Sequence, residues 1–293
     1  MLRVSKRGSE PLLRTTASAV IFTGSYSLLL HTQSLPRQIR LEGAHNFRDL
    51  GGYPLSCGGF FIPGQIYRSD HLGRLTSADR AKLSELGVAT VVDLRRASER
   101  AENPDLLMGT GINEVWLPVE AEGADVINIR HEVEAGRVDA QAAREFLIEA
   151  NRLFVTRFAE VYSKFLHLLL KPLSLPLVFH CSAGKDRAGY AAALTLLVAG
   201  ASKHDVMTDY LATNRCNEKY RRALTAAIPE YDGAEAKRLA LDVLMQVEEC
   251  YLAAAFSEID AGYRDASDYM SRALAFDADK QASLKALLTD AST

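Results

Sequence analysis

The sequence predicts an α/β fold with a central, mainly parallel sheet, flanking helices and a C-terminal helical layer. Short apolar runs alternate with helical segments from residue 39 to about residue 200, which is typical of parallel strands buried on both faces. Almost everything after residue 202 is helical in pattern. Hydrophobic residues make up 48% and charged residues 24% of the chain, which excludes a wholly disordered, collagen-like or coiled-coil protein.

Turn and capping signals define the first predicted elements. Paired glycines at 51–52 and 58–59 mark turns, and residues 65–67 form a short strand. A helix is predicted over residues 76–86, because a threonine at its start and an aspartate three residues later form a capping box. The glycine that follows is a typical helix stop.

Three further strands are predicted from short, mostly apolar runs. These runs are residues 88–93, 112–117 and 177–180. The first is continuous and rich in β-branched side chains, which suits a strand buried on both faces.

Helical patterns occupy most of the remaining chain. Residues 121–138 are polar and interrupted by glycine, and they lead into a long helix over residues 146–168 with one apolar stripe. Pro172 follows the end of that helix. A helix is also predicted over residues 190–198, and Ser202 caps the next one.

The domain organisation is predicted as an N-terminal extension, residues 1–37, and one domain, residues 38–293. The extension has basic residues before an apolar stretch at 17–30 that serine, threonine and glycine interrupt. A secretory signal has a cleaner apolar block near the start, so we expect a cytoplasmic protein, with secretion as the alternative. No apolar run approaches the roughly 20 residues of a spanning helix, and no integral membrane segment is expected.

Charge and cysteine usage narrow the class of function. Lys plus Arg number 34 against 37 Asp plus Glu, and a formal charge of −3 gives no reason to expect a nucleic-acid partner. The four cysteines lie far apart without a Cys-x-x-Cys pair, which excludes a disulfide framework or a zinc knuckle. Accordingly, no metal or cofactor is expected.

The segment from His180 to Gly189 is the strongest functional signal. It connects a predicted buried strand to a helix start, where a short loop directs several backbone N–H groups into one space. Gly184 permits the backbone conformations that such a loop needs. The guanidinium of Arg187 matches a tetrahedral oxyanion in bidentate fashion. This pattern predicts a phosphate site.

Cys181 begins this loop and is the predicted nucleophile. A thiol that faces amides, a guanidinium and a helix N-terminus should be ionised to a sizeable extent near neutral pH. A thiolate within a phosphate site indicates phosphoryl transfer through a cysteinyl-phosphate intermediate. The other three cysteines, Cys57, Cys216 and Cys250, are predicted to be small buried hydrophobic residues.

Cys181 to Arg187 fits the Cys-x5-Arg motif, and the chain resembles the cysteine-dependent tyrosine and dual-specificity phosphatases. The Gly-Lys-Asp-Arg sequence within this motif is similar to that of the bacterial tyrosine/serine phosphatases of the mycobacterial tyrosine phosphatase B type. The resemblance spans about residues 39–290. Other segments that match in the same order are Asn46–Gly52, Tyr67–Asp70, Asp93–Arg95 with Glu99, Asp209-Tyr210 with Asn214, and Tyr251–Ala255.

The resemblance implies a phosphatase-type fold and phosphotyrosine, phosphoserine, phosphothreonine or phosphoinositide substrates. It also implies a mobile helical lid over the site, for which residues 121–170 are the candidate, with a permanently packed helix as the simpler interpretation. The loop residues expected to bind substrate are Ser182, Ala183, Gly184, Lys185 and Ala188. Lys185 adds a cation that would suit a polyphosphorylated headgroup.

Asp186 is the first choice for the acid that protonates the leaving group. Related enzymes can use an aspartate shortly after the strand that matches residues 112–117, but this chain has glutamates there, at 120 and 122. A supporting role is predicted for His180, which orients the loop, and for Arg48, Asp49, Asp93 and Arg95, whose alternative is ion pairing within the core.

Ala188 departs from the family pattern, because Ser or Thr usually follows the arginine and helps to expel the cysteine sulfur. We therefore expect slow hydrolysis of the phosphoenzyme. The predicted function is a protein tyrosine/serine phosphatase. The alternatives are a phosphoinositide phosphatase, favoured by Lys185, and a phosphate-binding protein that has lost turnover, suggested by Ala188. A sulfurtransferase explains Arg187 less well.

Overall fold

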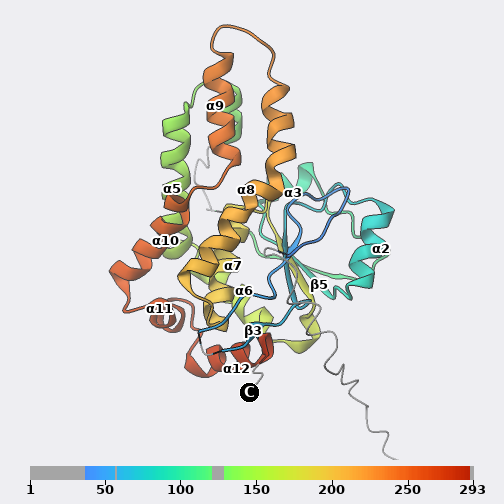
Figure 1. Ribbon diagram of the computed structural model, residues 1–293, viewed down its shortest axis with the longest axis vertical. Coiled ribbons are helices and arrows are strands. Elements are labelled where there is room, and N and C mark those ends of the chain that lie inside the picture. Colours follow the sequence, from blue (N-terminus) through green and yellow to red (C-terminus); the bar gives the residue numbers. More distant parts are fainter. Residues whose placement is uncertain (1–36, 57, 121–128, 291–293) are drawn as a thin grey trace, which may run out of the picture. The chain divides into compact units, whose positions relative to one another are not determined.

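The computed structural model describes residues 37–56, 58–120 and 129–290, and its central element is a six-stranded mixed sheet (Figure 1). Four neighbouring strands are parallel, and two short antiparallel strands complete one edge. In spatial order the strands are β1 (Arg37–Gln38), β2 (Arg48–Asp49), β4 (Ile66–Ser69), β7 (Leu177–His180), β5 (Thr90–Asp93) and β6 (Asn113–Trp116). The predicted fold class is confirmed.

The four parallel strands end in one row. Ser69 of β4 lies beside His180 of β7, which lies beside Asp93 of β5, and Asp93 lies beside Trp116 of β6. The carboxyl ends of parallel strands form the edge at which α/β proteins place their ligand sites. This register brings the residues that follow each strand to the same side of the molecule.

The two faces of the sheet pack against different cores. In β7, Leu177 and Phe179 belong to the larger core, whereas Val178 belongs to a smaller one. Alternate side chains of a strand point to opposite faces, so each apolar run serves both cores. Helix α2 (Ser77–Glu85) covers the smaller core through Leu83. This arrangement explains why β5 and β7 show no regular alternation of apolar and polar residues, whereas Asn113 and Glu114 of the edge strand β6 are exposed.

Helix α2 has the predicted capping box. The Thr76 hydroxyl accepts a hydrogen bond from the Asp79 amide at 3.2 Å, and the Asp79 carboxylate accepts one from the Thr76 amide at 3.0 Å. The same carboxylate also accepts from the amides of Glu42 and Gly43, both at 2.8 Å. The cap therefore also ties the segment before β2 to the helix.

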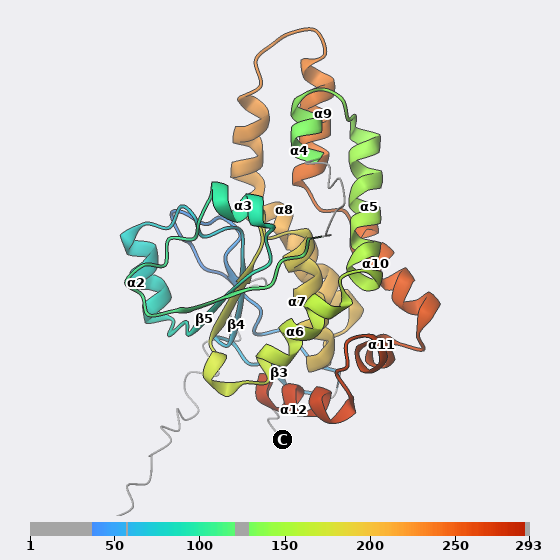
Figure 2. The same cartoon turned by 180° about the vertical axis from the view of Figure 1, so that it is seen from behind.

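Helices flank and extend the sheet on the side of the larger core (Figures 1 and 2). Both views show α5, α8 and α9 side by side beyond the carboxyl edge. The helices other than α2 are α3 (Ala97–Glu102), α4 (Ile129–Glu134), α5 (Ala140–Thr156), α6 (Ala159–Leu169), α7 (Asp186–Ala199), α8 (Lys203–Ala226), α9 (Ala234–Met245), α10 (Glu249–Gly262), α11 (Ala266–Ala273) and α12 (Ala278–Leu288). The predicted C-terminal helical layer is confirmed.

Two predicted helices differ from the observed ones. The apolar stripe over 146–168 belongs to two helices, α5 and α6, because the backbone leaves the helical conformation at Phe158 (φ −105°, ψ 16°). The break lets rings from both helices, Phe154 and Tyr162, pack against Tyr190 of α7. Helix α7 begins at Asp186, four residues before the predicted start, because the loop itself turns into its first helical turn.

The remaining elements are short. A 3-10 turn, η1 (Pro172–Ser174), precedes β7, and β3 (Phe60–Phe61) pairs antiparallel with β8 (Thr289–Asp290). Within the described residues, none of the helices has the length and apolarity that crossing a membrane requires. The predicted extension, apart from Arg37, and the start of the predicted lid, residues 121–128, lie outside the described residues.

Candidate active site

The chain turns sharply between β7 and α7, through residues 181–187, which we call the Cys181 loop. Gly184 has φ +67°, and a Cβ atom there would lie 2.5 Å from the carbonyl oxygen of Ser69. Both conditions require glycine, since other residues strain at this φ and the backbone of β4 cannot move aside. The close approach fixes the loop against the end of β4.

Two asparagines hold this loop from behind. Asn46 donates from Nδ2 to the carbonyl oxygens of Ala183 at 3.1 Å and Gly184 at 2.9 Å. Asn217 of α8 donates to the Ala183 carbonyl at 3.1 Å. In a planar trans peptide the N–H points opposite to the C=O. Anchoring these carbonyls therefore directs the amides that follow them to the other side of the loop.

Arg68 of β4 anchors the next carbonyls in the same way. Its Nη2 donates to the carbonyl oxygens of Gly184 at 2.6 Å and Lys185 at 3.2 Å. Gly189 lies beside this guanidinium, and a Cβ at position 189 would lie 2.7 Å from the ring of Tyr210, closer than the ring allows, and 3.5 Å from Arg68 Nη2, an ordinary contact. Gly189 thus makes room for the side chains that support the loop.

Arg68 belongs to a buried arginine cluster, formed by Arg48, Arg68 and Asp209. The Asp209 carboxylate contacts Arg48 Nε at 2.9 Å and Arg68 Nη1 at 2.5 Å, and all three side chains are at most 1% exposed. Burial opposes the charge of Asp209, but the two guanidinium groups hold the pKa of its carboxyl below the ordinary value. One carboxylate thus pairs two cations.

Arg187, the other end of the motif, is held by Glu99 of α3. Its Nη1 and Nη2 lie 2.6 and 2.8 Å from the two carboxylate oxygens of Glu99, and the Ser182 hydroxyl donates to the same carboxylate at 2.6 Å. Although burial favours the neutral acid, the Arg187 guanidinium holds the pKa of Glu99 well below its usual range. The pair fixes the direction of the guanidinium.

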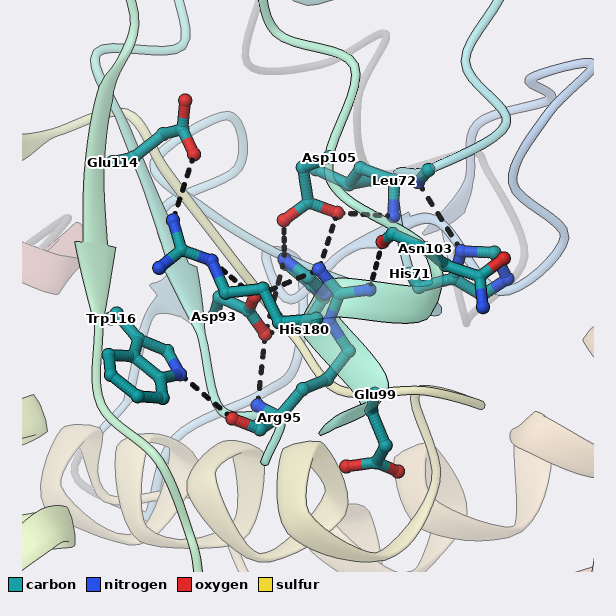
Figure 3. A network of polar contacts seen from close by, with 12 residues as sticks. His71, Leu72, Asp93, Arg95, Glu99, Asn103, Asp105, Glu114, Trp116 and His180 are labelled. Carbon is teal, nitrogen blue, oxygen red and sulfur yellow. Dashed lines mark hydrogen bonds and ion pairs between the residues drawn. The ribbon is translucent and has the colours of Figure 1, made fainter. Parts of the chain in front are cut away.

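His180, at the end of β7, belongs to a polar network at the carboxyl edge of the sheet (Figure 3). Its Nε2 lies 2.9 Å from Asp105 Oδ2, and its Nδ1 lies 3.2 Å from the carbonyl oxygen of Cys181. Burial lowers the tendency of the ring to protonate, but the Asp105 carboxylate outweighs it and the pKa of His180 is raised. The ring thus ties the start of the loop to a buried carboxylate.

Asp93 and Arg95 complete this network. The guanidinium of Arg95 lies 2.9 Å from Asp93 Oδ2 and 2.9 Å from Asp105 Oδ1, and Figure 3 shows the three side chains turned toward one another. The Asp93, Asp105 and His180 side chains lie close enough to hold a cation. Arg95 already supplies the positive charge between the two carboxylates, so ion pairing accounts for this group.

A cavity of about 760 Å³ opens on the front of the Cys181 loop. Its lining includes Ser182, Ala183, Lys185, Asp186 and Arg187 from the loop. Cys181 itself is 2% exposed and is not part of the lining, but it lies within electrostatic reach of the Arg187 guanidinium. The remaining walls combine charged side chains of both signs with apolar side chains of α5. They include Arg74, Arg96, Arg130, Arg157, Glu99, Glu102, Glu120, Glu134, Glu149, Phe146, Leu147, Ala150, Leu153 and Phe154.

Lys185 and Asp186 form an ion pair at the edge of this cavity. Lys185 Nζ lies 2.7 Å from Asp186 Oδ2, and the lysine side chain is 6% exposed. Asp186 Oδ1 accepts a hydrogen bond from the Tyr210 hydroxyl at 3.4 Å. The lysine charge is therefore matched by its neighbour, which weakens the expectation that it receives a second phosphate.

Comparison with known proteins places this loop in a family. Residues 39–290 match the sequence model of the tyrosine phosphatase family. The chain belongs to the tyrosine phosphatase family. This membership confirms the resemblance that the loop motif and the other matching segments indicate.

Two relatives match this tyrosine phosphatase over most of their length. A Cupriavidus necator protein, provisionally named a tyrosine-protein phosphatase, is 31% identical over 250 residues, which cover 83% of this chain and 89% of the relative. The triple specificity protein phosphatase PtpB of Mycobacterium tuberculosis is 29% identical over 256 residues, 78% of this chain and 91% of the relative.

Solved structures of phosphatases are also similar to parts of the chain. The catalytic core of Siw14 covers 76% of this chain and 96% of its own length, with 15% identity and a TM-score of 0.33. TpbA of P. aeruginosa covers 62% of this chain and 89% of its own, with 19% identity and a TM-score of 0.29.

No role was predicted from the sequence for several side chains that hold the Cys181 loop. The side chains concerned are Asn46, Arg68, Glu99, Asp105, Asp209 and Asn217. Four of them lie in segments that resemble the family, so those segments carried the signal. Nothing in the local pattern around Asp105 or Asn217 points to the loop, because their partners are more than 30 residues away.

Asp49 lies away from the Cys181 loop, and the predicted burial of the other cysteines is only partly confirmed. The Asp49 carboxylate accepts from the amides of Gly51 and Gly64, both at 2.8 Å, and so stabilises the turn after β2 rather than the Cys181 loop. Cys216 is buried as predicted, but the prediction for Cys250 was wrong: it lies exposed, with Sγ 3.7 Å from a Glu248 carboxylate oxygen. Cys57 lies outside the described residues.

The predicted lid contributes walls to the cavity. Residues of α4 and α5 line it, and the opposite side of α5 is buried in the larger core through Ala143 and Val155. Motion of these helices stays a prediction.

Proposed function

We propose that this member of the family is a metal-independent phosphomonoester hydrolase that acts on phosphotyrosine and phosphoserine in proteins through a cysteinyl-phosphate. The Cys181 thiolate attacks phosphorus, so that an S–P bond forms while the ester P–O bond breaks. The leaving oxygen takes a proton from Asp186. Water then attacks phosphorus and gives a proton to the Asp186 carboxylate, the S–P bond breaks, and inorganic phosphate and the thiolate are released.

The observation that carries this proposal is the orientation of the loop peptides. Three consecutive carbonyls are anchored away from the cavity by Asn46, Asn217 and Arg68. The N–H groups of the same three peptides therefore face the cavity side of the loop. There they stabilise the negative charge of a phosphate in the transition state. Arg187, fixed by Glu99, adds a guanidinium on the same side.

Asp186 lines the cavity in the first turn of α7, which supports its choice as the acid. Because its carboxylate pairs with Lys185 at 2.7 Å, this role requires Asp186 to take up a proton before the ester bond breaks. A departing phenolate needs little assistance, whereas a serine alkoxide needs a proton. Glu120, after β6, lines the same cavity and accepts a hydrogen bond from the Ala97 amide at 3.2 Å. We assign the role to Asp186, which belongs to the loop.

The test is a phosphate-release panel with chelator present. It contains a phosphotyrosyl peptide, a phosphoseryl peptide and a soluble inositol phosphate, and it compares the wild type with Cys181→Ser and with Cys250→Ser, which removes an exposed thiol far from the motif in sequence. We expect turnover of both peptides by the wild type and Cys250→Ser, and its loss in Cys181→Ser.

Three outcomes would contradict the proposal. Loss of activity on chelation would exclude the metal-independent mechanism. A specificity constant higher for the inositol phosphate than for either peptide would favour the phosphoinositide alternative. Peptide binding by Cys181→Ser, beside a wild type that releases no phosphate even from an aryl phosphate, would indicate a binding protein without turnover.

A further inference from the structure

The Cys181 loop is surrounded by ion pairs that mostly balance. Arg187 is matched by Glu99 at 2.6 Å, and Lys185 is matched by Asp186 at 2.7 Å. In the described part of the chain, these two pairs therefore bring no excess charge to the loop. A group that favours a thiolate at Cys181 before any phosphate arrives has to lie elsewhere.

The buried arginine cluster differs from those pairs, because it holds two cations against one carboxylate. Arg48 and Arg68 are both 0% exposed, and both contact Asp209. The other titratable groups that face the cluster in the described residues are neutral at pH 7, since burial raises the pKa of Tyr53, Tyr210 and Cys216. The cluster thus carries one unmatched positive charge in a low-dielectric interior.

That charge lies behind the loop that Cys181 begins. Arg68 is in β4, which pairs in parallel with β7, and Cys181 follows the last residue of β7. The Arg68 guanidinium donates to the Gly184 and Lys185 carbonyls, so it touches the same loop that Cys181 begins. Burial and the neighbouring Arg48 lower the pKa of Arg68, and Asp209 and, to a smaller extent, a negative charge on Cys181 oppose that effect.

We propose that the buried arginine cluster is a positioning device that stabilises the Cys181 thiolate from behind the loop, through the single positive charge that Arg48, Arg68 and Asp209 leave unmatched. This inference rests on the proposed function, since it concerns the same nucleophile. It assigns electrostatic work to residues that make no contact with substrate. Arg68 supplies both the charge and two carbonyl anchors. Among the described residues, Arg48 contacts no carbonyl of the loop and reaches it through Asn46, whose side-chain oxygen accepts a hydrogen bond from Arg48 Nη1.

Other groups near Cys181 also affect its charge, so the experiment has to keep them constant. Arg187 and Tyr162 interact with it on the remaining sides, and His180 contacts its carbonyl oxygen. Burial raises the pKa of Tyr162 well above its usual value, so that side chain stays neutral. The variants below leave all three of these residues unchanged.

The test measures the rate of Cys181 alkylation by iodoacetamide from pH 4 to 9, read at Cys181 by mass spectrometry. Because only the thiolate reacts, the midpoint of the profile reports its stabilisation. We expect Arg68→Met to raise the midpoint by about one pH unit, a roughly tenfold slower reaction at low pH. Arg48→Met raises it less, and Asp209→Asn, which removes the negative charge, lowers it.

Asn217→Ala is the matched control, because it removes a carbonyl anchor of the same loop without changing any charge. Its midpoint should move much less than that of Arg68→Met, because Asn46 still holds the same carbonyl. The proposal is overturned if Arg68→Met and Arg48→Met leave the midpoint unchanged, if Asp209→Asn moves it in the same direction as they do, or if Asn217→Ala moves it as far as Arg68→Met. Should Arg68→Met fail to fold, the opposite signs of Arg48→Met and Asp209→Asn decide.

The wild-type profile separates this proposal from the proposed function. If Cys181 reacts with the midpoint of an ordinary thiol, near pH 8.5, the nucleophile itself is wrongly assigned. If the wild-type midpoint is low and the Arg68 and Arg48 variants share it, only the role of the cluster fails.

Discussion

Arg187 and Glu99 face each other through two parallel contacts, at 2.6 and 2.8 Å, across 88 residues of sequence. The Ser182 hydroxyl donates to the same carboxylate, so one acidic side chain fixes both the cation and an early residue of the loop. A guanidinium that is already oriented loses little conformational freedom when it binds an oxyanion.

Replacing Glu99 by Gln should therefore impair catalysis without removing Arg187. We expect kcat/KM on a phosphotyrosyl peptide to fall by roughly 10- to 100-fold, since small displacements of a catalytic group have effects of this size. Ser182→Ala, which keeps the ion pair, should lose much less. Equal losses in the two variants would show that the carboxylate does not orient the guanidinium.

The glycine at the centre of the loop allows a second test. Gly184 and Gly136 have similar positive φ values, +67° and +72°, but only at Gly184 would a Cβ meet backbone atoms, while at Gly136 nothing lies within 4 Å. Gly136→Ala should cost about 1 kcal/mol of unfolding free energy with activity retained. Gly184→Ala should in addition reduce kcat/KM by at least about 100-fold. If both substitutions reduced kcat/KM equally, activity would not depend on the close approach of Gly184 to β4.

The sequence predicted the position of the loop and of the buried strands well, because these depend on local signals. Cys181, Gly184 and Arg187 lie within seven residues, and the apolar runs identify buried strands directly. The supporting side chains escaped prediction, since Asn217 and the carbonyl that it binds are 34 residues apart. Only tertiary packing brings such pairs together.

The break between α5 and α6 shows a different limit. The apolar stripe continues through Phe154, Phe158 and Tyr162, so periodicity alone indicates one helix. After the break at Phe158, the ring of Tyr162 packs against Tyr190 of another helix, with the ring centroids 4.7 Å apart. A one-dimensional pattern does not contain that contact.

The loss of activity on replacing Asp186 should depend on the leaving group of the substrate. If it supplies the proton, Asp186→Asn will slow release of phosphate from a phosphoseryl peptide far more than from an aryl phosphate with an acidic phenol, because the phenolate leaves without assistance. Specificity constants of wild type and variant on the two substrates give the comparison. A uniform loss on both would assign Asp186 to binding, and Glu120→Gln would then be the next variant to measure.

The His180–Asp105 contact predicts a pH-dependent stability. The folded pKa of His180 is raised above the ordinary value, mainly by the nearby Asp105 carboxylate acting against burial. The protonated ring thus stabilises the fold fully below about pH 6.5, the ordinary histidine value, and this contribution is lost as the pH rises through the folded pKa.

Urea unfolding from pH 5.5 to 8.5 checks this sign. The difference in unfolding free energy between wild type and Asp105→Asn should be largest at pH 5.5 and should shrink toward pH 8.5. His71, whose pKa burial lowers to about 4, protonates on unfolding at the acid end of this range. That contribution is the same in wild type and variant, so it cancels in the difference. A difference that grows with pH would mean that the ring is neutral in the folded protein.

Ala188 sets the last prediction, because it is fully buried directly after Arg187 and has no hydroxyl to donate to the Cys181 sulfur. Expulsion of the sulfur during hydrolysis of the phosphoenzyme should then be slow, which gives a burst of product followed by a low steady rate in rapid mixing. Ala188→Thr should abolish the burst and raise the steady rate by roughly tenfold, since one charge-assisted hydrogen bond is worth about 1.5 kcal/mol or more.

Cys216→Thr is the control for adding a hydroxyl at another buried position. If the wild type shows no burst and Ala188→Thr turns over at the wild-type rate, formation rather than hydrolysis of the phosphoenzyme limits this protein, and the alanine is tolerated because the slow step comes before it.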